Sequence, residues 1–217
     1  MSVKVGLKYI EIWKESMEDK VLSYEAENAE RGQIVLYGPS NFTRWSEEFG
    51  HKNARDVLLG KSGKKCVINR GFGSSCPEHH LYYYPRLIRP LEPKVLVYAC
   101  YGNSSAFGYS SEEAWELAQR VIAYAKTDFP DIKIYICGPA RKPVPNLSEE
   151  MDVKRFTGWA KQFCKDTENC YYIDVYAHEE LGAPDLFVED NVHFNQKGYD
   201  LYEKVIREGI RDELDKF

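Results

Sequence analysis

The sequence lacks the patterns that mark several large functional classes. Its 217 residues include six cysteines but no Cys-x-x-Cys pair, so cysteine spacing gives a structural zinc site no support. No apolar run approaches the roughly 20 residues that cross a bilayer, and the first residues do not resemble a secretion signal. The formal net charge of −5 does not favour nucleic-acid binding. We therefore expect a soluble, cytoplasmic protein that has neither membrane nor nucleic acid as a partner.

Motifs that bind nucleotides are also incomplete. The stretch Gly71-Phe72-Gly73-Ser74 could present backbone N–H groups to an anion. It lacks the third glycine of a dinucleotide fingerprint, however, and no P-loop lysine follows it. We therefore expect no cofactor.

A metal site has equally little support. His79 and His80 are adjacent in the sequence, so their side chains point in different directions from a helix or a strand. Two such histidines rarely bind one ion, although a metal site in residues 76–80 is an alternative. We expect no metal.

What the sequence does contain is a regular alternation of two patterns. Short apolar runs typical of buried strands alternate with segments whose apolar residues have helical spacing. The predicted strands are 33–37, 65–69, 94–100, 132–137 and 171–175, and the predicted helices are 6–28, 42–49, 78–88, 110–126, 148–164 and 196–214. This alternation predicts a five-stranded parallel sheet with helices on both faces. No repeat or linker is visible, so we expect a single α/β domain over residues 1–217.

Individual residues support these elements. Ser110 and Glu113 form a capping-box pattern, and Asn195 is suited to cap the last helix. The first helix has apolar residues at helical spacing: Leu7, Ile10, Trp13, Met17, Val21 and Tyr24. Three cysteines in apolar, strand-like runs are expected to be reduced core residues: Cys66, Cys100 and Cys137.

Polar residues follow three of the predicted strands. Ser40 comes after the first strand, the Gly73-Ser74 loop after the second, and Asn103 after the third. In a parallel α/β sheet the site lies at the carboxyl ends of the strands. We therefore expect these three loops to converge on one edge of the sheet.

Two residues near the C-terminus could complete a nucleophilic site with Ser40. Asp190 and His193 are three residues apart, so they can sit on one turn and face the same way. A serine hydroxyl needs a base to take its proton, and a histidine does this best when a carboxylate fixes its tautomer. The surroundings of Ser40 are not the elbow of α/β-hydrolases, because Phe42 stands where the second glycine should be.

Each of these residues also has a simpler interpretation. Ser40 could be an N-cap, Asn103 could be a turn residue that tolerates a left-handed backbone, and His193 could be a packed core histidine. A serine in one loop and a histidine in another do not by themselves choose between these interpretations.

Four stretches, in order along the chain, resemble the SGNH hydrolase superfamily, also called GDSL esterases. Residues 38–40 resemble the first conserved block and 69–75 the second, often written NRGFGGS in bacterial members. Residues 101–103 resemble the third block, and Asp190-Asn191-Val192-His193 resembles the DxxH fifth block. The resemblance implies a flavodoxin-like, three-layer α/β/α sandwich and hydrolysis of esters without a metal.

The resemblance also implies roles for particular residues. Ser40 would be the nucleophile, His193 the base and Asp190 the residue that orients the base. The oxyanion hole would consist of the backbone N–H groups of Ser40 and Ser74 and the side chain of Asn103.

The chain departs from the family pattern at three positions. Pro39 replaces the Asp of the GDS triplet, Ser74 replaces a glycine, and Ser104 replaces the Asp that usually follows the third-block Asn. Ser74 can serve only if it adopts the backbone conformation of that glycine.

The expected function is a serine esterase acting on a small acyl ester, with an acetylated carbohydrate as one candidate. The departures keep open a degenerate family member that binds acylated carbohydrate without turnover. A flavodoxin-like binding domain of another class is a further alternative, but the chain shows no phosphate-cradling loop with an aromatic clamp.

Overall fold

The computed structural model describes residues 6–9, 14–144 and 147–217. In this part of the chain five strands form one parallel sheet in the order β2-β1-β3-β4-β5, which confirms the predicted sheet. The strands are β1 (Ile34–Gly38), β2 (Val67–Gly71), β3 (Val95–Tyr98), β4 (Lys133–Cys137) and β5 (Cys170–Ile173). Each strand begins and ends within two residues of its predicted bounds.

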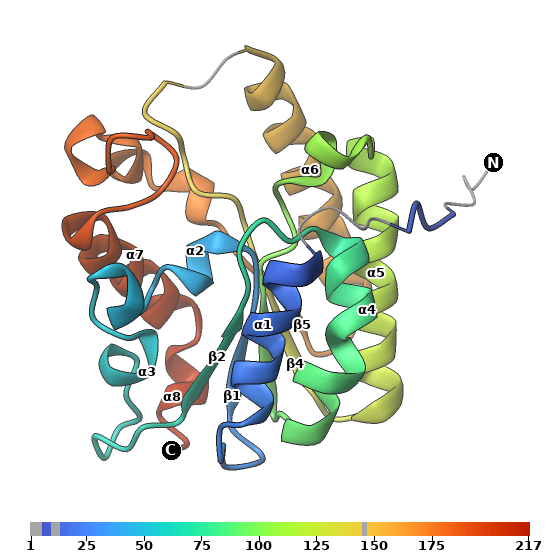
Figure 1. Ribbon diagram of the computed structural model, residues 1–217, viewed down its shortest axis with the longest axis vertical. Helices are drawn as coiled ribbons and strands as arrows, with labels where there is room; N and C mark the ends of the chain where they lie inside the picture. Colours follow the sequence, from blue (N-terminus) through green and yellow to red (C-terminus); the bar gives the residue numbers. More distant parts are fainter. Residues whose placement is uncertain (1–5, 10–13, 145–146) are drawn as a thin grey trace.

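Helices cover both faces of the sheet and give the expected three-layer sandwich (Figure 1). One face carries α1 (Lys14–Glu25), α4 (Pro77–Leu87), α5 (Ser111–Asp128) and α6 (Leu147–Asp166). The other carries α2 (Ser40–Thr43), α3 (Ala54–Val57), α7 (Gln196–Gly209) and α8 (Arg211–Leu214). Short 3₁₀ turns lie between these elements: η1 (Glu47–Phe49), η2 (Arg89–Leu91), η3 (Ser104–Phe107), η4 (Val175–Ala177), η5 (Glu179–Gly182) and η6 (Pro184–Leu186).

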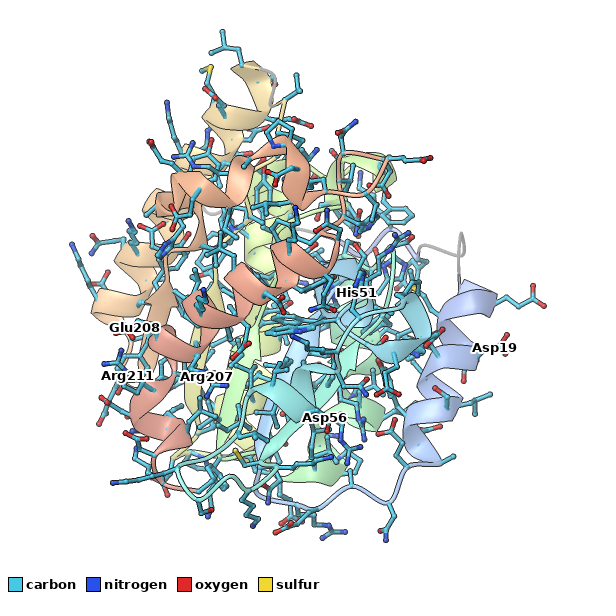
Figure 2. All side chains as sticks on the ribbon, turned by 90° about the vertical axis from the view of Figure 1, so that its left-hand side faces the viewer. Asp19, His51, Asp56, Arg207, Glu208 and Arg211 are labelled. Carbon is cyan, nitrogen blue, oxygen red and sulfur yellow. The ribbon has the colours of Figure 1, made fainter. Side chains whose placement is uncertain are left out.

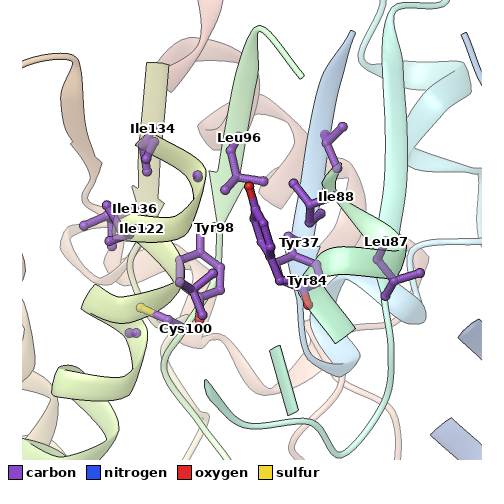
Figure 3. Close-up of a cluster of buried hydrophobic side chains, with 14 of the residues drawn as sticks. Tyr37, Tyr84, Leu87, Ile88, Leu96, Tyr98, Cys100, Ile122, Ile134 and Ile136 are labelled. Atoms are coloured by element: carbon purple, nitrogen blue, oxygen red, sulfur yellow. The ribbon is translucent and has the colours of Figure 1, made fainter. Parts of the chain in front are cut away.

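The strands contribute side chains to two cores, because successive residues of a strand point to opposite faces of the sheet. Tyr37 and Tyr98 lie in the core beneath α4 and α5, beside Leu96 and Ile134 (Figure 3). The opposite core holds the alternate strand residues and the inner face of α7: Ile34, Leu36, Val95, Val97, Tyr199, Tyr202 and Ile206. The three cysteines expected in the core are buried free thiols.

The predicted helix caps are present. The Ser110 side chain accepts a hydrogen bond from the Glu113 backbone at 3.2 Å, and the Glu113 carboxylate accepts one from the Ser110 backbone at 2.8 Å. Asn195 caps α7 by accepting from the backbone N–H of Gly198 at 3.2 Å. Both helices therefore begin where the sequence predicts.

The prediction of one helix over residues 6–28 was wrong at both ends. Residues 6–9 are not helical, because the Lys8 backbone N–H donates to the side chains of Glu78 and Tyr109 instead. At the other end, α1 stops at Glu25, where Arg70 donates to the carbonyl of Tyr24. The expected inner residues that the structure describes within the helix are buried: Met17, Val21 and Tyr24. Leu7 is exposed, and Ile10 and Trp13 lie outside the described residues.

Two other predicted helices are interrupted. The 42–49 helix is divided into α2 and η1, and the carbonyl of Phe42 accepts the side-chain amide of Asn69 at 2.7 Å. The 196–214 helix is divided between α7 and α8. Gly209 packs so tightly on β5 that a Cβ atom would lie 2.8 Å from the side chain of Ile173. In both cases a contact with a distant strand decides where the helix ends.

The outer surface of α7 anchors the end of α3 and the chain that follows it. Arg207 lies on this face (Figure 2), and its guanidinium donates to the carbonyl oxygens of Val57 and Leu59. No helix in the described part of the chain is long and apolar enough to cross a membrane.

Candidate active site

Ser40 lies at the first position of α2, immediately beyond the end of β1. The turn that places it there depends on Gly38, since a Cβ atom at that position would lie 2.6 Å from the Ala99 carbonyl oxygen at the end of β3. Pro39 has an extended backbone and is the N-cap. The Ser40 hydroxyl is thereby held at the carboxyl-terminal edge of the sheet, as predicted.

The Ser40 hydroxyl is linked to two distant side chains. Its Oγ lies 3.0 Å from Nε2 of His193, and Nδ1 of His193 lies 2.7 Å from Oδ2 of Asp190. The structure therefore joins the three residues that the sequence suggested in one hydrogen-bonded chain. In this geometry Nδ1–H donates to the carboxylate, which leaves Nε2 as the acceptor for the serine proton.

A closed turn holds Asp190 and His193 in this arrangement. The backbone N–H of Val188 donates to the His193 carbonyl at 2.9 Å, and Asn191 adopts a left-handed backbone with φ of 54°. Phe194, next to the histidine, is buried in the core beneath α7. The turn and the buried Phe194 thus fix the position of the imidazole, and only 17% of the His193 side chain is exposed.

The Asp190 carboxylate is held in its ionised form. Burial would raise its pKa, but hydrogen bonds from the His193 ring and from the backbone N–H groups of His193 and Val192 outweigh this and lower the pKa to about 2. An ionised Asp190 is required to keep the proton of His193 on Nδ1.

The alternative that Ser40 is an N-cap does not fit the structure. Pro39 occupies the N-cap position, and the Ser40 hydroxyl is directed to His193. The backbone N–H of Ser40 is not among the donors that bond within the described residues. This N–H is therefore available to a ligand at the start of α2.

The end of β2 is fitted closely against α2. Asn69 accepts from the Gly71 backbone N–H at 2.9 Å and donates to the Phe42 carbonyl at 2.7 Å. A side chain at Gly71 would clash with the backbone N–H of Thr43, which its Cβ would approach to 2.6 Å. The loop after β2 is thereby held beside the turn that carries Ser40.

Ser74 lies in that loop, with an exposed side chain and a left-handed backbone at φ of 58°. This is a conformation that glycine adopts easily and other residues rarely do. Ser74 therefore has a φ at which glycine would be free of strain. It is not one of the described residues that line the cavity beside Ser40.

Asn103 follows β3 and also has a left-handed backbone, with φ of 57°. Its Nδ2 donates to the carbonyl oxygen of Ser75 at 3.0 Å, and the residue lines the same cavity as Ser40. Asn103 is therefore a turn residue at the cavity whose amide bonds to the loop after β2.

The two neighbouring histidines point in different directions, as predicted. Nδ1 of His79 lies 3.3 Å from the sulfur of Cys76, whereas both ring nitrogens of His80 bond to hydroxyls deep in the core. No group of three or more His, Cys, Asp or Glu side chains within the described residues could hold a metal ion.

A cavity of about 280 Å³ opens beside Ser40. Its floor is apolar, and Phe156 packs against Tyr101 and Trp115 with ring centroids 5.1 and 5.5 Å apart. Burial, together with the nearby Asp152 and Glu149 carboxylates, raises the pKa of Tyr101 to about 12, so its hydroxyl stays protonated.

The rim of the cavity is polar and its two cations are already paired. Lys142 lies 2.8 Å from Glu149, and Arg141 stacks over the Tyr176 ring while donating to the Tyr176 carbonyl at 2.9 Å. Serine hydroxyls and carboxylates also line the cavity: Ser105, Ser111, Glu150 and Asp152. This rim suits a ligand that carries hydroxyl groups.

Several of these residues were not singled out by sequence reasoning. The aromatic floor was not foreseen, and Asn69 gave no local sign of its two bonds. The order of the blocks in the sequence was the only signal that Asn69 lies near Ser40.

Comparison with known proteins identifies the family of this chain. A sequence model of the GDSL-like lipase/acylhydrolase family matches residues 32–201. Comparison with curated protein sequences finds no match.

Solved structures similar to this chain include several esterases. A GDSL-like lipase from Bacteroides thetaiotaomicron has a TM-score of 0.70 and 16% identity, over 90% of this chain and 97% of that one. An acetyl xylan esterase, AlAXEase, has a TM-score of 0.67 and 18% identity, over 82% and 99%. The psychrotrophic esterase EstA from Pseudoalteromonas sp., in a structure inhibited by monoethylphosphonate, has a TM-score of 0.65 and 14% identity, over 84% and 98%.

At these identities the structures show the fold, which is that of SGNH hydrolases. The family model carries the assignment further, since it spans most of the chain and includes Ser40, Asp190 and His193. The chain therefore belongs to the GDSL-like lipase/acylhydrolase family.

Proposed function

We propose that this protein is a serine esterase that uses Ser40 as nucleophile, His193 as base and Asp190 as the residue that orients the base. The observation that supports this most directly is the hydrogen-bonded chain from Ser40 through His193 to Asp190 at the edge of the cavity. A degenerate, non-catalytic protein would have no need to preserve that chain, so the binding alternative is not favoured.

In the first half of the proposed reaction, His193 Nε2 takes the proton of the Ser40 hydroxyl as its oxygen attacks the ester carbonyl carbon. The carbonyl oxygen becomes an oxyanion, which the N–H groups of Ser40 and Ser74 and the Asn103 amide would stabilise. The intermediate then collapses, His193 gives its proton to the departing alcohol, and an acyl group remains on Ser40.

In the second half, a water molecule gives a proton to His193 and its oxygen attacks the acyl carbon. The same donors hold the second oxyanion. Collapse returns the proton from His193 to Ser40 and releases the carboxylic acid.

The cavity supports a small acyl group and a polar alcohol. Its volume of about 280 Å³ is at the low end for ligand pockets, which leaves little room for a long acyl chain. The apolar floor formed by Tyr101, Trp115 and Phe156 suits a short acyl group, and the hydroxyl-rich rim suits a carbohydrate. Acetylated carbohydrates are therefore our proposed substrate class.

Two assays test the proposal. Purified protein should hydrolyse p-nitrophenyl acetate faster than the p-nitrophenyl esters of long-chain acids, and it should release acetate from acetylated oligosaccharides. A phosphonofluoridate should label Ser40 and stop both reactions, and mass spectrometry of the labelled peptide would identify the site. Labelling of another serine, or turnover that survives complete labelling of Ser40, would contradict the assignment.

A further inference from the structure

A second serine–histidine pair joins the loop after β2 to α4. The Oγ of Ser75 lies 2.9 Å from Nε2 of His80, and Nδ1 of His80 lies 3.1 Å from the hydroxyl of Tyr98. All three residues are fully buried, and Tyr98 lies in the core between β3 and α4 (Figure 3). The pair is therefore closed to substrate.

The hydrogen bonds around the pair determine where each proton sits. The Ser75 hydroxyl donates to the Phe72 carbonyl at 2.7 Å, so its oxygen is left to accept a hydrogen bond from His80. Nε2 of His80 must then carry the hydrogen, and Nδ1 must accept from the Tyr98 hydroxyl. In this arrangement each of these buried groups has a partner.

The other protonation states leave buried groups unpaired. If Nδ1 carried the hydrogen, the Tyr98 hydroxyl would have to accept a hydrogen bond from it, and the hydroxyl's own proton would have no acceptor within the described residues. Doubly protonated His80 leaves the same proton unpaired, and burial also lowers the pKa of His80 well below its ordinary value. Since an unpaired buried donor is costly, the neutral Nε2–H tautomer is the one that fits.

The bonded loop leads directly to the proposed oxyanion hole. Ser75 follows Ser74, and the Ser75 carbonyl accepts the side-chain amide of Asn103 at 3.0 Å. The carbonyl of His80 in turn accepts from Tyr37 of β1 at 2.6 Å, so α4 is pinned to the sheet at this point. The Ser75 side chain is thus bonded to His80, and its carbonyl is bonded to Asn103.

We propose that His80 is a positioning residue for the oxyanion hole, because its Nε2–H fixes Ser75 and so sets the positions of Ser74 and Asn103. This inference rests on the proposed function, since it assigns a role within that reaction. Ser75 is not a second nucleophile, because its proton is committed to the Phe72 carbonyl.

A pair of variants of similar shape tests the role of the Nε2–H group. In His80→Gln the side-chain amide can still donate to Ser75, whereas His80→Met has nearly the same size and no donor. His80→Met should lower kcat by roughly tenfold to a hundredfold, less than the loss of an oxyanion donor itself. Its KM should stay within about twofold, because the bond to Ser75 does not touch the bound ester. His80→Gln should keep most of the kcat.

Two further variants separate positioning from general stability. Ser75→Ala removes the acceptor and should lower kcat like His80→Met, and combining the two changes should add little, since they remove the same bond. Tyr135→Phe removes the hydrogen bond that the buried Tyr135 hydroxyl donates to the Glu213 carboxylate at 3.1 Å, in the core on the opposite face of the sheet. It should lower the melting temperature without lowering kcat.

A measurement on the unmodified protein does not depend on activity. Long-range ¹H–¹⁵N correlation spectra of the imidazole rings should show one histidine locked as the Nε2–H tautomer from pH 5 to pH 9, and its signals should vanish in His80→Gln. A His80 that titrates, or that carries its proton on Nδ1, overturns the inference.

The kinetic outcomes distinguish the two proposals. An inactive wild type contradicts the proposed function. An active wild type together with a folded His80→Met or Ser75→Ala of unchanged kcat contradicts only the positioning role. Equal losses of kcat in Tyr135→Phe and His80→Met would also overturn it, because a general loss of stability would then explain both.

Discussion

The molecule contains two serine–histidine pairs with almost the same geometry and different surroundings. The Ser40–His193 distance is 3.0 Å and the Ser75–His80 distance is 2.9 Å. The first pair lies at a cavity, and the histidine is backed by the Asp190 carboxylate. The second pair lies in the core, and the histidine is backed by the Tyr98 hydroxyl.

The two pairs differ in the group that bonds to Nδ1 of the histidine and in their exposure to the cavity. The Asp190 carboxylate accepts a hydrogen bond from Nδ1–H, which leaves Nε2 of His193 free to remove a proton from Ser40. The Tyr98 hydroxyl donates a hydrogen bond to Nδ1, so Nε2 of His80 carries the ring hydrogen and donates to Ser75. A serine–histidine distance alone therefore does not identify a nucleophile.

The largest effect should follow from removing either member of the exposed pair. Ser40→Ala and His193→Ala should each lower kcat on the order of a million-fold, because nucleophile and base act as a unit and losing one costs about as much as losing both. Turnover of p-nitrophenyl acetate and circular dichroism would be measured together. Ser75→Ala is the matched control and should lose far less. Substantial activity in folded Ser40→Ala would reverse the roles given to the two pairs.

The next largest effect should come from the carboxylate that distinguishes the pairs. Asp190→Asn should lower kcat about ten-thousand-fold, because the amide can no longer hold the Nδ1–H tautomer of His193. Its KM should change little if substrate binding is intact. A loss of less than about tenfold would show that His193 keeps its tautomer without Asp190.

Wild type and Asp190→Asn should also differ in how their stability depends on pH in acid. The pKa of Asp190 in the folded protein, about 2, is below its ordinary value near 3.9. A lowered pKa means that Asp190 stabilises the fold above about pH 4, and that this contribution is lost as the pH falls toward 2. The melting temperature of Asp190→Asn should therefore approach that of the wild type between pH 4 and pH 2. A gap that stays constant through this range would contradict the lowered pKa.

The fold could be predicted from the sequence because its strands are short apolar runs with clear boundaries. Where the prediction failed, a contact with a distant residue ended a helix. Asn69 bonds to the Phe42 carbonyl and Ile173 packs against Gly209, and no local sequence pattern predicts either contact. The local pattern favours a helix over many residues, whereas a single contact with the sheet can end that helix.

The candidate site was predicted unevenly for a related reason. Asp190 and His193 are three residues apart and share one turn, so their pairing is visible locally. Ser40 could be placed beside them because it follows a strand, and strand ends converge in this type of sheet. The bond from His80 to Ser75 was not foreseen, because it requires knowing that both residues turn inward toward Tyr98.

A smaller effect is expected at Asn103, which connects the two pairs through Ser75. Asn103→Ala should lower kcat by roughly two to three orders of magnitude, as for the loss of one oxyanion donor. Asn103→Gly is the control for the backbone, because glycine adopts φ of 57° easily but also lacks the amide. Both variants should lower kcat by the same factor, and the glycine variant should be the more stable of the two. Near-normal kcat in Asn103→Gly would leave Asn103 as a turn residue only.

The smallest effects should occur at Ser74, which carries only a backbone N–H to the proposed oxyanion hole. Its φ of 58° is easy for glycine, so Ser74→Gly should keep kcat within about threefold of the wild type. The melting temperature should change little, because relief of backbone strain and the greater flexibility of the unfolded chain oppose each other.

Proline would also remove the N–H of Ser74, but it cannot adopt this backbone, so its effect would mix a lost donor with a distorted loop. Valine is the sharper probe, since a β-branched residue disfavours a left-handed backbone yet keeps its N–H. Ser74→Val should therefore lower kcat while KM stays near the wild-type value, and Ser74→Gly should not. If Ser74→Gly instead raised a nearly absent wild-type activity, the serine side chain would be blocking the hole, and the exposed pair would be intact but idle. If both variants kept the wild-type kcat, the loop after β2 would not contribute to the oxyanion hole, and the buried pair beneath it would support only the fold.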